Sequence, residues 1–236
     1  MSDLDTKTAD DRPAQVPAHK PYGFSALISG LAKMWRGTVP ALIAIVVNTV
    51  VQAALVYWNA GIGLNAPFII SSIISAGVLV LCFALLARTS LQAVTGRVSL
   101  SNAFSETATI LPTFALWALV LIVLVMAGFM LFPLLGLVVC WLLAFLAPAA
   151  ADGQRNAIGA NFSALKERWG RWLITSLLLT IGGVIMLLLM ALNVFFFTGF
   201  AASIIGWLVL GLIAWWLLTT WSAIYRSTRV GGAGAE

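Results

Sequence analysis

The sequence predicts an all-α membrane protein in which six transmembrane helices form three hairpins. Three stretches carry no charged residue: Gly37–Ala87, Thr107–Ala151 and Trp172–Tyr225, of 51, 45 and 54 residues. A helix that crosses a bilayer needs about 20 apolar residues, so each stretch has room for two crossings and a turn but not for three. The composition agrees, because 61% of the residues are hydrophobic and 9% are charged, whereas soluble domains average about 25% charged residues.

Each charge-free stretch divides at an uncharged turn. The first turn is the segment 59–66, which is rich in Gly and Asn, the second centres on Pro133 and Gly136, and the third lies near 193–199. A charge at the bilayer centre costs about 2.5–3.5 kcal/mol, so we place the spans between the charged segments. The six predicted spans are Val39–Trp58, Pro67–Ala87, Leu111–Met130, Leu134–Ala150, Trp172–Asn193 and Phe200–Trp221.

The distribution of cations predicts the orientation. All thirteen Lys and Arg residues lie outside the three hairpin turns, and such residues collect on the cytoplasmic side of a membrane. We therefore expect both termini in the cytoplasm. The chain divides into a disordered cytoplasmic tail (1–22), a six-helix transmembrane domain (23–226) and a cytoplasmic C-terminal tail (227–236). The net charge of +5 indicates contact with anionic headgroups rather than with nucleic acid.

A cytoplasmic amphipathic helix is predicted before each hairpin. In Phe24–Trp35 the apolar residues recur at offsets 0, 3, 4, 7, 10 and 11, which is one face of a helix. Phe162–Leu173 has a similar stripe opposite basic residues, and the middle segment, Leu100–Leu111, has Ser99 or Ser101 as a candidate N-cap. Such helices suit the headgroup boundary. The pattern leaves open whether they anchor the bundle, gate it or dock a partner.

Two groups of residues are candidate sites. Basic residues of the amphipathic helices are candidates for binding lipid headgroups, since each cation near an anionic leaflet contributes about 1 kcal/mol. Asn48 and Gln52, four residues apart on the first span, are the intramembrane candidates, because amides buried in hydrocarbon need partners. Packing is favoured over ligand binding for this pair. The headgroup candidates are Lys33, Arg36, Lys166, Arg168 and Arg171.

The residues give no pattern for catalysis or for a cofactor. Glu106 and Asp152 are isolated carboxylates, which we interpret as a solvated surface group and a turn residue. Cys82 and Cys140 fall within predicted spans, and His19 lies in the N-terminal tail, so no metal-ligand cluster is predicted. An enzyme is therefore not expected, and neither a metal nor another cofactor is predicted. Without an intramembrane carboxylate, transport driven by protons or sodium is also disfavoured.

Two segments between the predicted hairpins carry a family resemblance. Ala149–Leu173, with Ala-Ala-Ala-Asp-Gly and Asn-Phe-Ser-Ala-Leu-Lys-Glu-Arg-Trp-Gly-Arg-Trp-Leu, and Gly96–Phe104 resemble uncharacterised bacterial six-helix membrane proteins. That group includes the membrane domain attached to some glycerophosphodiester phosphodiesterases. The resemblance implies a six-helix domain in a bacterial plasma membrane. The phosphodiesterase catalytic domain is absent from this chain, so no catalytic residue is carried over.

These observations favour a non-enzymatic protein of the cell envelope. We expect an accessory or scaffold subunit that contacts anionic phospholipid or a membrane partner. The alternative is a small transporter, which would be either a facilitator or the substrate-binding membrane subunit of an ATP-driven importer, with an ATPase as its partner.

Overall fold

The computed structural model describes residues 24–58, 65–167, 169–196 and 199–232, and these residues form helices joined by short connections. The predicted tail 1–22 and most of the first turn, 59–64, lie outside the described residues. The elements are α1 (Phe24–Met34), the 3-10 helix η1 (Trp35–Gly37), α2 (Thr38–Trp58), α3 (Ala66–Thr95), α4 (Leu100–Leu131), α5 (Pro133–Leu142), α6 (Leu146–Ala151), α7 (Ala157–Glu167), α8 (Trp169–Phe196) and α9 (Gly199–Gly232).

Five helical segments are long and apolar enough to cross a membrane. They are Ile28–Trp58, Ala66–Thr95, Leu100–Leu131, Leu134–Ala151 and Gly199–Thr228. A sixth apolar segment, Trp172–Gly182 of α8, is shorter within the described residues. The chain therefore has the composition of a multi-pass, all-helical membrane protein, while the count of six crossings stays a prediction.

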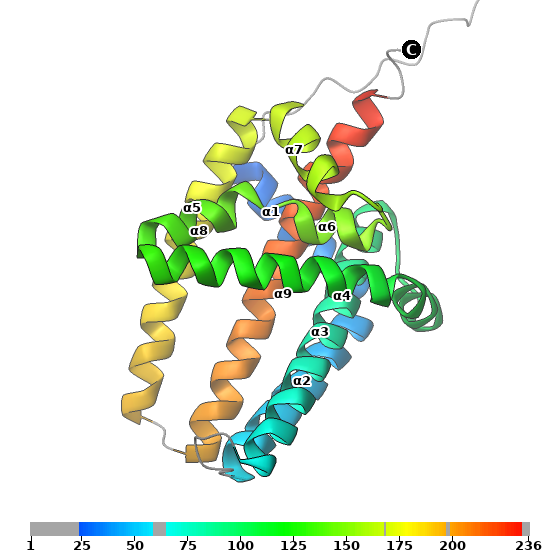
Figure 1. The fold of residues 1–236 in the computed structure, drawn as a ribbon. Helices are drawn as coiled ribbons and strands as arrows, with labels where there is room; N and C mark the ends of the chain where they lie inside the picture. Colours follow the sequence, from blue (N-terminus) through cyan, green and yellow to red (C-terminus); the bar gives the residue numbers. More distant parts are fainter. Residues whose placement is uncertain (1–23, 59–64, 168, 197–198, 233–236) are drawn as a thin grey trace, which may run out of the picture.

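The helices run in two directions (Figure 1). In this view α2, α3, α8 and α9 follow one common direction, and α4 and α5 run across it. The hairpin of α4 and α5 turns at Phe132 and Pro133, which is the position the sequence predicts. Its two helices approach closely, since a Cβ built on Gly128 would lie 2.9 Å from the Cα of Gly136. The middle hairpin thus differs in orientation from its neighbours.

The middle amphipathic helix is not a separate element. Ser99 caps the N-terminus of α4 by accepting a hydrogen bond at Oγ from the Asn102 N–H (3.3 Å), and the helix then continues to Leu131. Pro112 lies inside it, although a proline removes one intrahelical hydrogen bond. The predicted amphipathic segment Leu100–Leu111 and the predicted third span are therefore one continuous helix.

The fourth predicted span is broken between α5 and α6. Pro148 explains the position of the break, because a proline ring in a helix clashes with the carbonyl four residues earlier, which here is that of Ala144. The break is repaired by Asn161 of α7, which is fully buried. Its Oδ1 accepts from the Phe145 N–H (2.9 Å) and its Nδ2 donates to the Leu142 carbonyl (2.8 Å).

Other boundaries also differ from the sequence prediction. The third predicted amphipathic segment, Phe162–Leu173, overlaps the last residues of α7, described to Glu167, and the first residues of α8, described from Trp169, while residue 168 lies outside the described residues. Trp172 is buried, and its Nε1 donates to the Trp141 carbonyl (3.0 Å). Helix α9 continues to Gly232, through part of the predicted tail 227–236.

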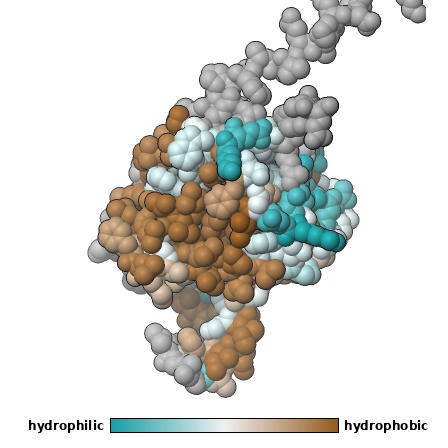
Figure 2. Space-filling view, turned by 45° about the horizontal axis from the view of Figure 1, so that its top comes forward, coloured by the Kyte–Doolittle hydropathy of each residue, from teal (hydrophilic) through white to brown (hydrophobic). Residues whose placement is uncertain are grey.

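The buried core lies where α6 meets α3, α4, α7 and α9. All six residues of α6 are buried, because alanine and proline side chains let neighbouring helices approach closely. Large aromatic side chains complete this core, among them Phe114, Phe145 and Tyr225. Hydrophobic residues cover a broad face of the molecule in Figure 2, as expected for a surface in contact with lipid.

Candidate functional site

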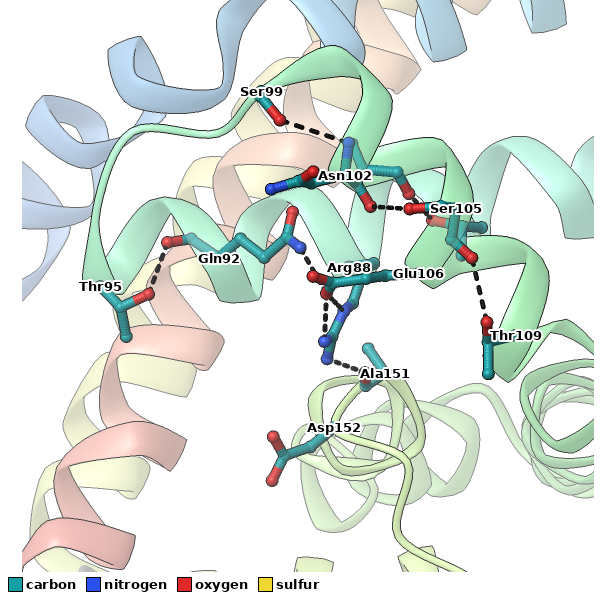
Figure 3. Close-up of polar contacts among 12 residues, drawn as sticks. Arg88, Gln92, Thr95, Ser99, Asn102, Ser105, Glu106, Thr109, Ala151 and Asp152 are labelled. Atoms are coloured by element: carbon teal, nitrogen blue, oxygen red, sulfur yellow. Dashed lines mark hydrogen bonds and ion pairs between the residues drawn. The ribbon is translucent and has the colours of Figure 1, made fainter.

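Charged side chains meet at the C-terminal end of α6. Arg88 of α3 donates from Nε to Glu106 Oε2 of α4 (2.8 Å) and from Nη1 to the Ala151 carbonyl (2.8 Å). The remaining guanidinium nitrogen of Arg88, Nη2, is ion-paired with the same carboxylate oxygen, Glu106 Oε2. Gln92, one turn along α3, also donates to Glu106 Oε2 (2.5 Å). Figure 3 shows Arg88 and Gln92 reaching one carboxylate from the same helix.

A second ion pair lies next to the first and involves Asp152, the residue that follows Ala151. Asp152 Oδ1 lies 3.1 Å from Arg226 Nη2 of α9, and the Tyr225 hydroxyl donates to Asp152 Oδ2 (3.3 Å). Only 13% of the Asp152 side chain is exposed. We call Arg88, Glu106, Asp152 and Arg226 the ion-pair cluster. It joins α3, α4, α6 and α9 and contains two cations and two anions.

The sequence analysis missed this cluster. It interprets Glu106 as solvated and Asp152 as a turn residue. Asp152 does lie in the turn that follows α6, and 40% of the Glu106 side chain is exposed, but the prediction did not foresee that each carboxylate pairs with an arginine. A signal was present in the spacing of Arg88 and Gln92, which are four residues apart and therefore on one helical face. What the sequence lacks is the information that α4 and α6 bring their polar groups to that face.

Removing one member of the cluster is expected to destabilise the fold. Arg88→Met leaves Glu106 and the Ala151 carbonyl without their guanidinium partner, and we expect a loss of about 1–2 kcal/mol in the free energy of unfolding, reduced by the partial exposure of Glu106. SDS-induced unfolding of the detergent-solubilised protein, followed by tryptophan fluorescence, measures it. Arg97→Met is the control, because Arg97 is exposed. Equal stability of the two variants would contradict a structural role for this ion pair.

The two intramembrane candidates lie together, as their spacing predicts. Both are buried on α2, and Gln52 Nε2 lies 3.4 Å from Asn48 Oδ1. The amide of Gln52 pairs mainly with α3, because Ser75 Oγ donates to Gln52 Oε1 (2.7 Å) and Gln52 Nε2 donates to the Ser75 carbonyl (3.1 Å). These contacts join the two helices of the first hairpin and satisfy the glutamine in an apolar setting.

Asn48 also lines a cavity of about 260 Å³ between α2, α3 and α9. Its other walls are apolar or aromatic and include Phe83, Trp207 and Leu210. One amide in an apolar pocket could orient a small ligand. Besides this amide, the lining includes the free thiol of Cys82, and no carboxylate, histidine or cation is among the lining residues.

Three of the five headgroup candidates are described. Lys33 is half-buried on α1, whereas Arg36 of η1 and Lys166 of α7 are exposed. Exposed aromatic residues accompany them: Trp35, 80% exposed, precedes Arg36, and Phe162 and Trp169 lie near Lys166 in sequence. Arg168 and the side chain of Arg171 lie outside the described residues.

Helix α1 lies close to α9 at a glycine. A Cβ added to Gly30 would contact Thr220 of α9, so the backbones of the two helices approach closely. Two members of the predicted apolar stripe, Ile28 and Leu31, are more than half exposed. They therefore do not serve as core residues of the bundle.

Among the described residues, no group of three His, Cys, Asp or Glu side chains is placed to hold a metal ion. Cys82 is buried and Cys140 is half-buried, and both are free thiols. His19 lies outside the described residues. Comparison with models of protein families, with curated proteins and with solved structures gives no match.

Proposed function

We propose that this chain is a non-enzymatic accessory or scaffold protein of a bacterial plasma membrane, with six crossings and both termini in the cytoplasm. It contacts anionic phospholipid through Lys33, Arg36, Lys166, Arg168 and Arg171, or it holds a membrane partner. The resemblance described above supports the bacterial setting and the six-helix domain. No cofactor takes part in this function.

One observation carries the proposal: the exposed cations of η1 and α7 lie close in sequence to exposed aromatic side chains. Arg36 follows Trp35, and Lys166 lies between Phe162 and Trp169 in sequence. Aromatic rings favour the boundary between headgroups and hydrocarbon, and cations near an anionic leaflet gain about 1 kcal/mol each. By contrast, Glu106 and Asp152 are engaged in ion pairs, which supports a structural rather than a catalytic use of the carboxylates.

The test replaces all five cations with glutamine and measures lipid preference. Wild-type protein in vesicles of equal phosphatidylglycerol and phosphatidylcholine should retain mainly phosphatidylglycerol on detergent extraction, quantified by mass spectrometry. Because about 1.4 kcal/mol is a factor of ten and each contact is worth about 1 kcal/mol, losing even two contacts should lower this preference about thirtyfold.

The control replaces five other cations, Lys7, Arg12, Lys20, Arg97 and Arg155, with glutamine. It removes the same total charge and should keep most of the preference. An equal loss in both variants would mean that net charge alone attracts the lipid, and no loss in the first variant would refute the headgroup site.

A second candidate function, transport, is favoured by the cavity that Asn48 lines. The chain would be a facilitator, or the substrate-binding membrane subunit of an ATP-driven importer. An ATPase that copurifies from native membranes, together with uptake that is lost in Asn48→Leu, would favour transport over the accessory function.

A further inference from the structure

The cavity that Asn48 lines contains a hydrogen-bond donor that the described residues leave unused. Only 9% of Asn48 is exposed, and it lies on α2 within the first predicted span. Its Oδ1 lies 3.4 Å from Gln52 Nε2, whereas its Nδ2 has no hydrogen-bond partner among the described residues. This nitrogen is also not fully enclosed by protein atoms. A molecule in the cavity can therefore reach it.

The hydrogen bonds of Gln52 determine which atom of the Asn48 amide is free. The backbone carbonyl of Ser75 can only accept, so the Gln52 atom that lies 3.1 Å from it must be the nitrogen Nε2. The oxygen of the same amide accepts from Ser75 Oγ (2.7 Å). Because Nε2 points its second hydrogen toward Asn48, the atom of Asn48 that faces it is the oxygen. The NH2 group of Asn48 is consequently the one left without a partner.

The rest of the lining restricts what can occupy the cavity. It contains no carboxylate, histidine or cation, so nothing would compensate the desolvation of a charged ligand. A saturated hydrocarbon chain would leave the buried donor of Asn48 unpaired, which costs about 1–3 kcal/mol. A water molecule could accept from Asn48, but it takes up about 30 Å³ and would leave most of the apolar wall without contacts. An uncharged organic molecule with an acceptor group meets all three conditions.

The size and the walls of the cavity indicate the body of that molecule. Its volume is about 260 Å³, and since a cavity of about 150 Å³ takes up benzene, this one suits roughly ten non-hydrogen atoms. Phe83 of α3 and Trp207 of α9 are among the lining residues, and aromatic side chains pack favourably against another ring. Leu79, also in the lining, is 37% exposed, so the cavity lies close to the apolar surface and a ligand enters from the bilayer.

We propose that this cavity is a binding site for a small, uncharged aromatic molecule that carries a carbonyl or a similar hydrogen-bond acceptor. The acceptor receives a hydrogen bond from Asn48 Nδ2, and the ring lies against Phe83 and Trp207. Gln52 holds Asn48 Oδ1, which leaves Nδ2 directed into the cavity. This site rests on the membrane setting of the proposed function, but not on the five headgroup cations. A molecule of this class would also be the substrate if the chain is a transporter.

The experiment compares two probes that differ in the acceptor alone. They are para-fluoroacetophenone, which has a carbonyl, and para-fluoroethylbenzene, which has none. Fluorine NMR relaxation measures the affinity of each probe for the full-length protein in nanodiscs, after subtraction of the signal from empty nanodiscs. The ratio of the two affinities is compared between variants, so that unequal partitioning into lipid cancels. In Asn48→Leu this ratio should fall about fivefold, because the ketone loses one hydrogen bond and the hydrocarbon loses none.

Matched controls accompany both kinds of variant. Asn102→Leu makes the same change at an exposed position of α4 and should leave the ratio unchanged. Ala214→Phe fills the cavity from α9 and should abolish saturable binding of both probes. Ala54→Phe, at an exposed position of α2, should bind them as the wild type does.

A spectroscopic measurement on the wild type keeps the test decisive if Asn48→Leu does not fold. A hydrogen bond lowers the infrared stretching frequency of the bound ketone, and a frequency equal to that in an alkane solvent would refute the contact with Asn48. The site is also refuted by an unchanged ratio in folded Asn48→Leu, by a wild type without saturable binding of the ketone, or by binding that persists in folded Ala214→Phe. Equally tight binding of para-fluorobenzoate would overturn the restriction to uncharged ligands.

The variant lacking all five headgroup cations separates the two proposals. It should lose its preference for phosphatidylglycerol and still bind the ketone as the wild type does. If it keeps that preference, the headgroup site is wrong while the cavity site stands. If it loses the preference but Asn48→Leu leaves the affinity ratio unchanged, the cavity site is wrong while the headgroup site stands.

Discussion

Replacing Asn161 with leucine should lower the free energy of unfolding by about 2–5 kcal/mol, the largest effect that we expect from a single substitution. Leucine has a similar size, so the change removes hydrogen bonds more than it removes volume. The Phe145 N–H and the Leu142 carbonyl would both lose their partner inside a dry core. Each buried polar group left unpaired costs about 1–3 kcal/mol.

The measurement is an SDS titration of the purified protein, followed by tryptophan fluorescence and by loss of helical circular dichroism. Asn102→Leu is the control, because Asn102 is exposed at the start of α4. Its midpoint should stay within about 0.5 kcal/mol of the wild type, as for most surface substitutions. Equal midpoints for the two variants would show that the break between α5 and α6 does not depend on the asparagine.

The second large effect is expected at the crossing of α4 and α5. Gly128→Ala places a Cβ 2.9 Å from the Cα of Gly136 and 3.1 Å from its backbone nitrogen. These are backbone atoms, which cannot move aside as a side-chain tip would, so the two helices must separate. We expect a loss of about 1–3 kcal/mol, which is typical of overpacked sites.

Gly77→Ala is the matched control for this substitution. Gly77 lies inside α3, and a Cβ built there meets nothing within 4 Å. The replacement should stabilise α3 by about 0.5–1 kcal/mol, since alanine is the better helix former. The two variants should therefore shift the unfolding midpoint in opposite directions. A stabilising Gly128→Ala would mean that α4 and α5 lie farther apart than described here.

Several elements follow from the sequence because single local features determine them. The hairpin turn at Pro133 is predicted correctly, since proline favours the first turn of a helix and is the first residue of α5. The pairing of Asn48 and Gln52 on one face of α2 follows from helical spacing alone. The N-cap at Ser99 is one of the two candidates that the sequence offers.

Other features could not be predicted because they depend on tertiary contacts. The sequence places Leu134–Ala150 in one span, although Pro148 could have indicated a break. The broken segment is tolerated because Asn161 satisfies its backbone, and only the folded chain brings α7 to that place. Similarly, the partners of Arg88 come from α4 and α6. Hydrophobic periodicity predicts helices but not the angle at which α4 crosses α3, so these contacts could not be predicted.

The membrane proposals depend on the topology of the chain. Pro133 is the most informative position, because it lies at the turn between α4 and α5, which run across the direction of the other long helices. After replacement of Cys82 and Cys140 with alanine, single cysteines at Gly61, Pro133, Thr198, Arg97 and Arg155 can be treated in intact cells with a membrane-impermeant maleimide. Our account predicts labelling from outside at 61, 133 and 198, and labelling at 97 and 155 only after permeabilisation. Protection of position 133 in intact cells, followed by labelling in permeabilised cells, would contradict six crossings and show that α4 and α5 stay on the cytoplasmic side.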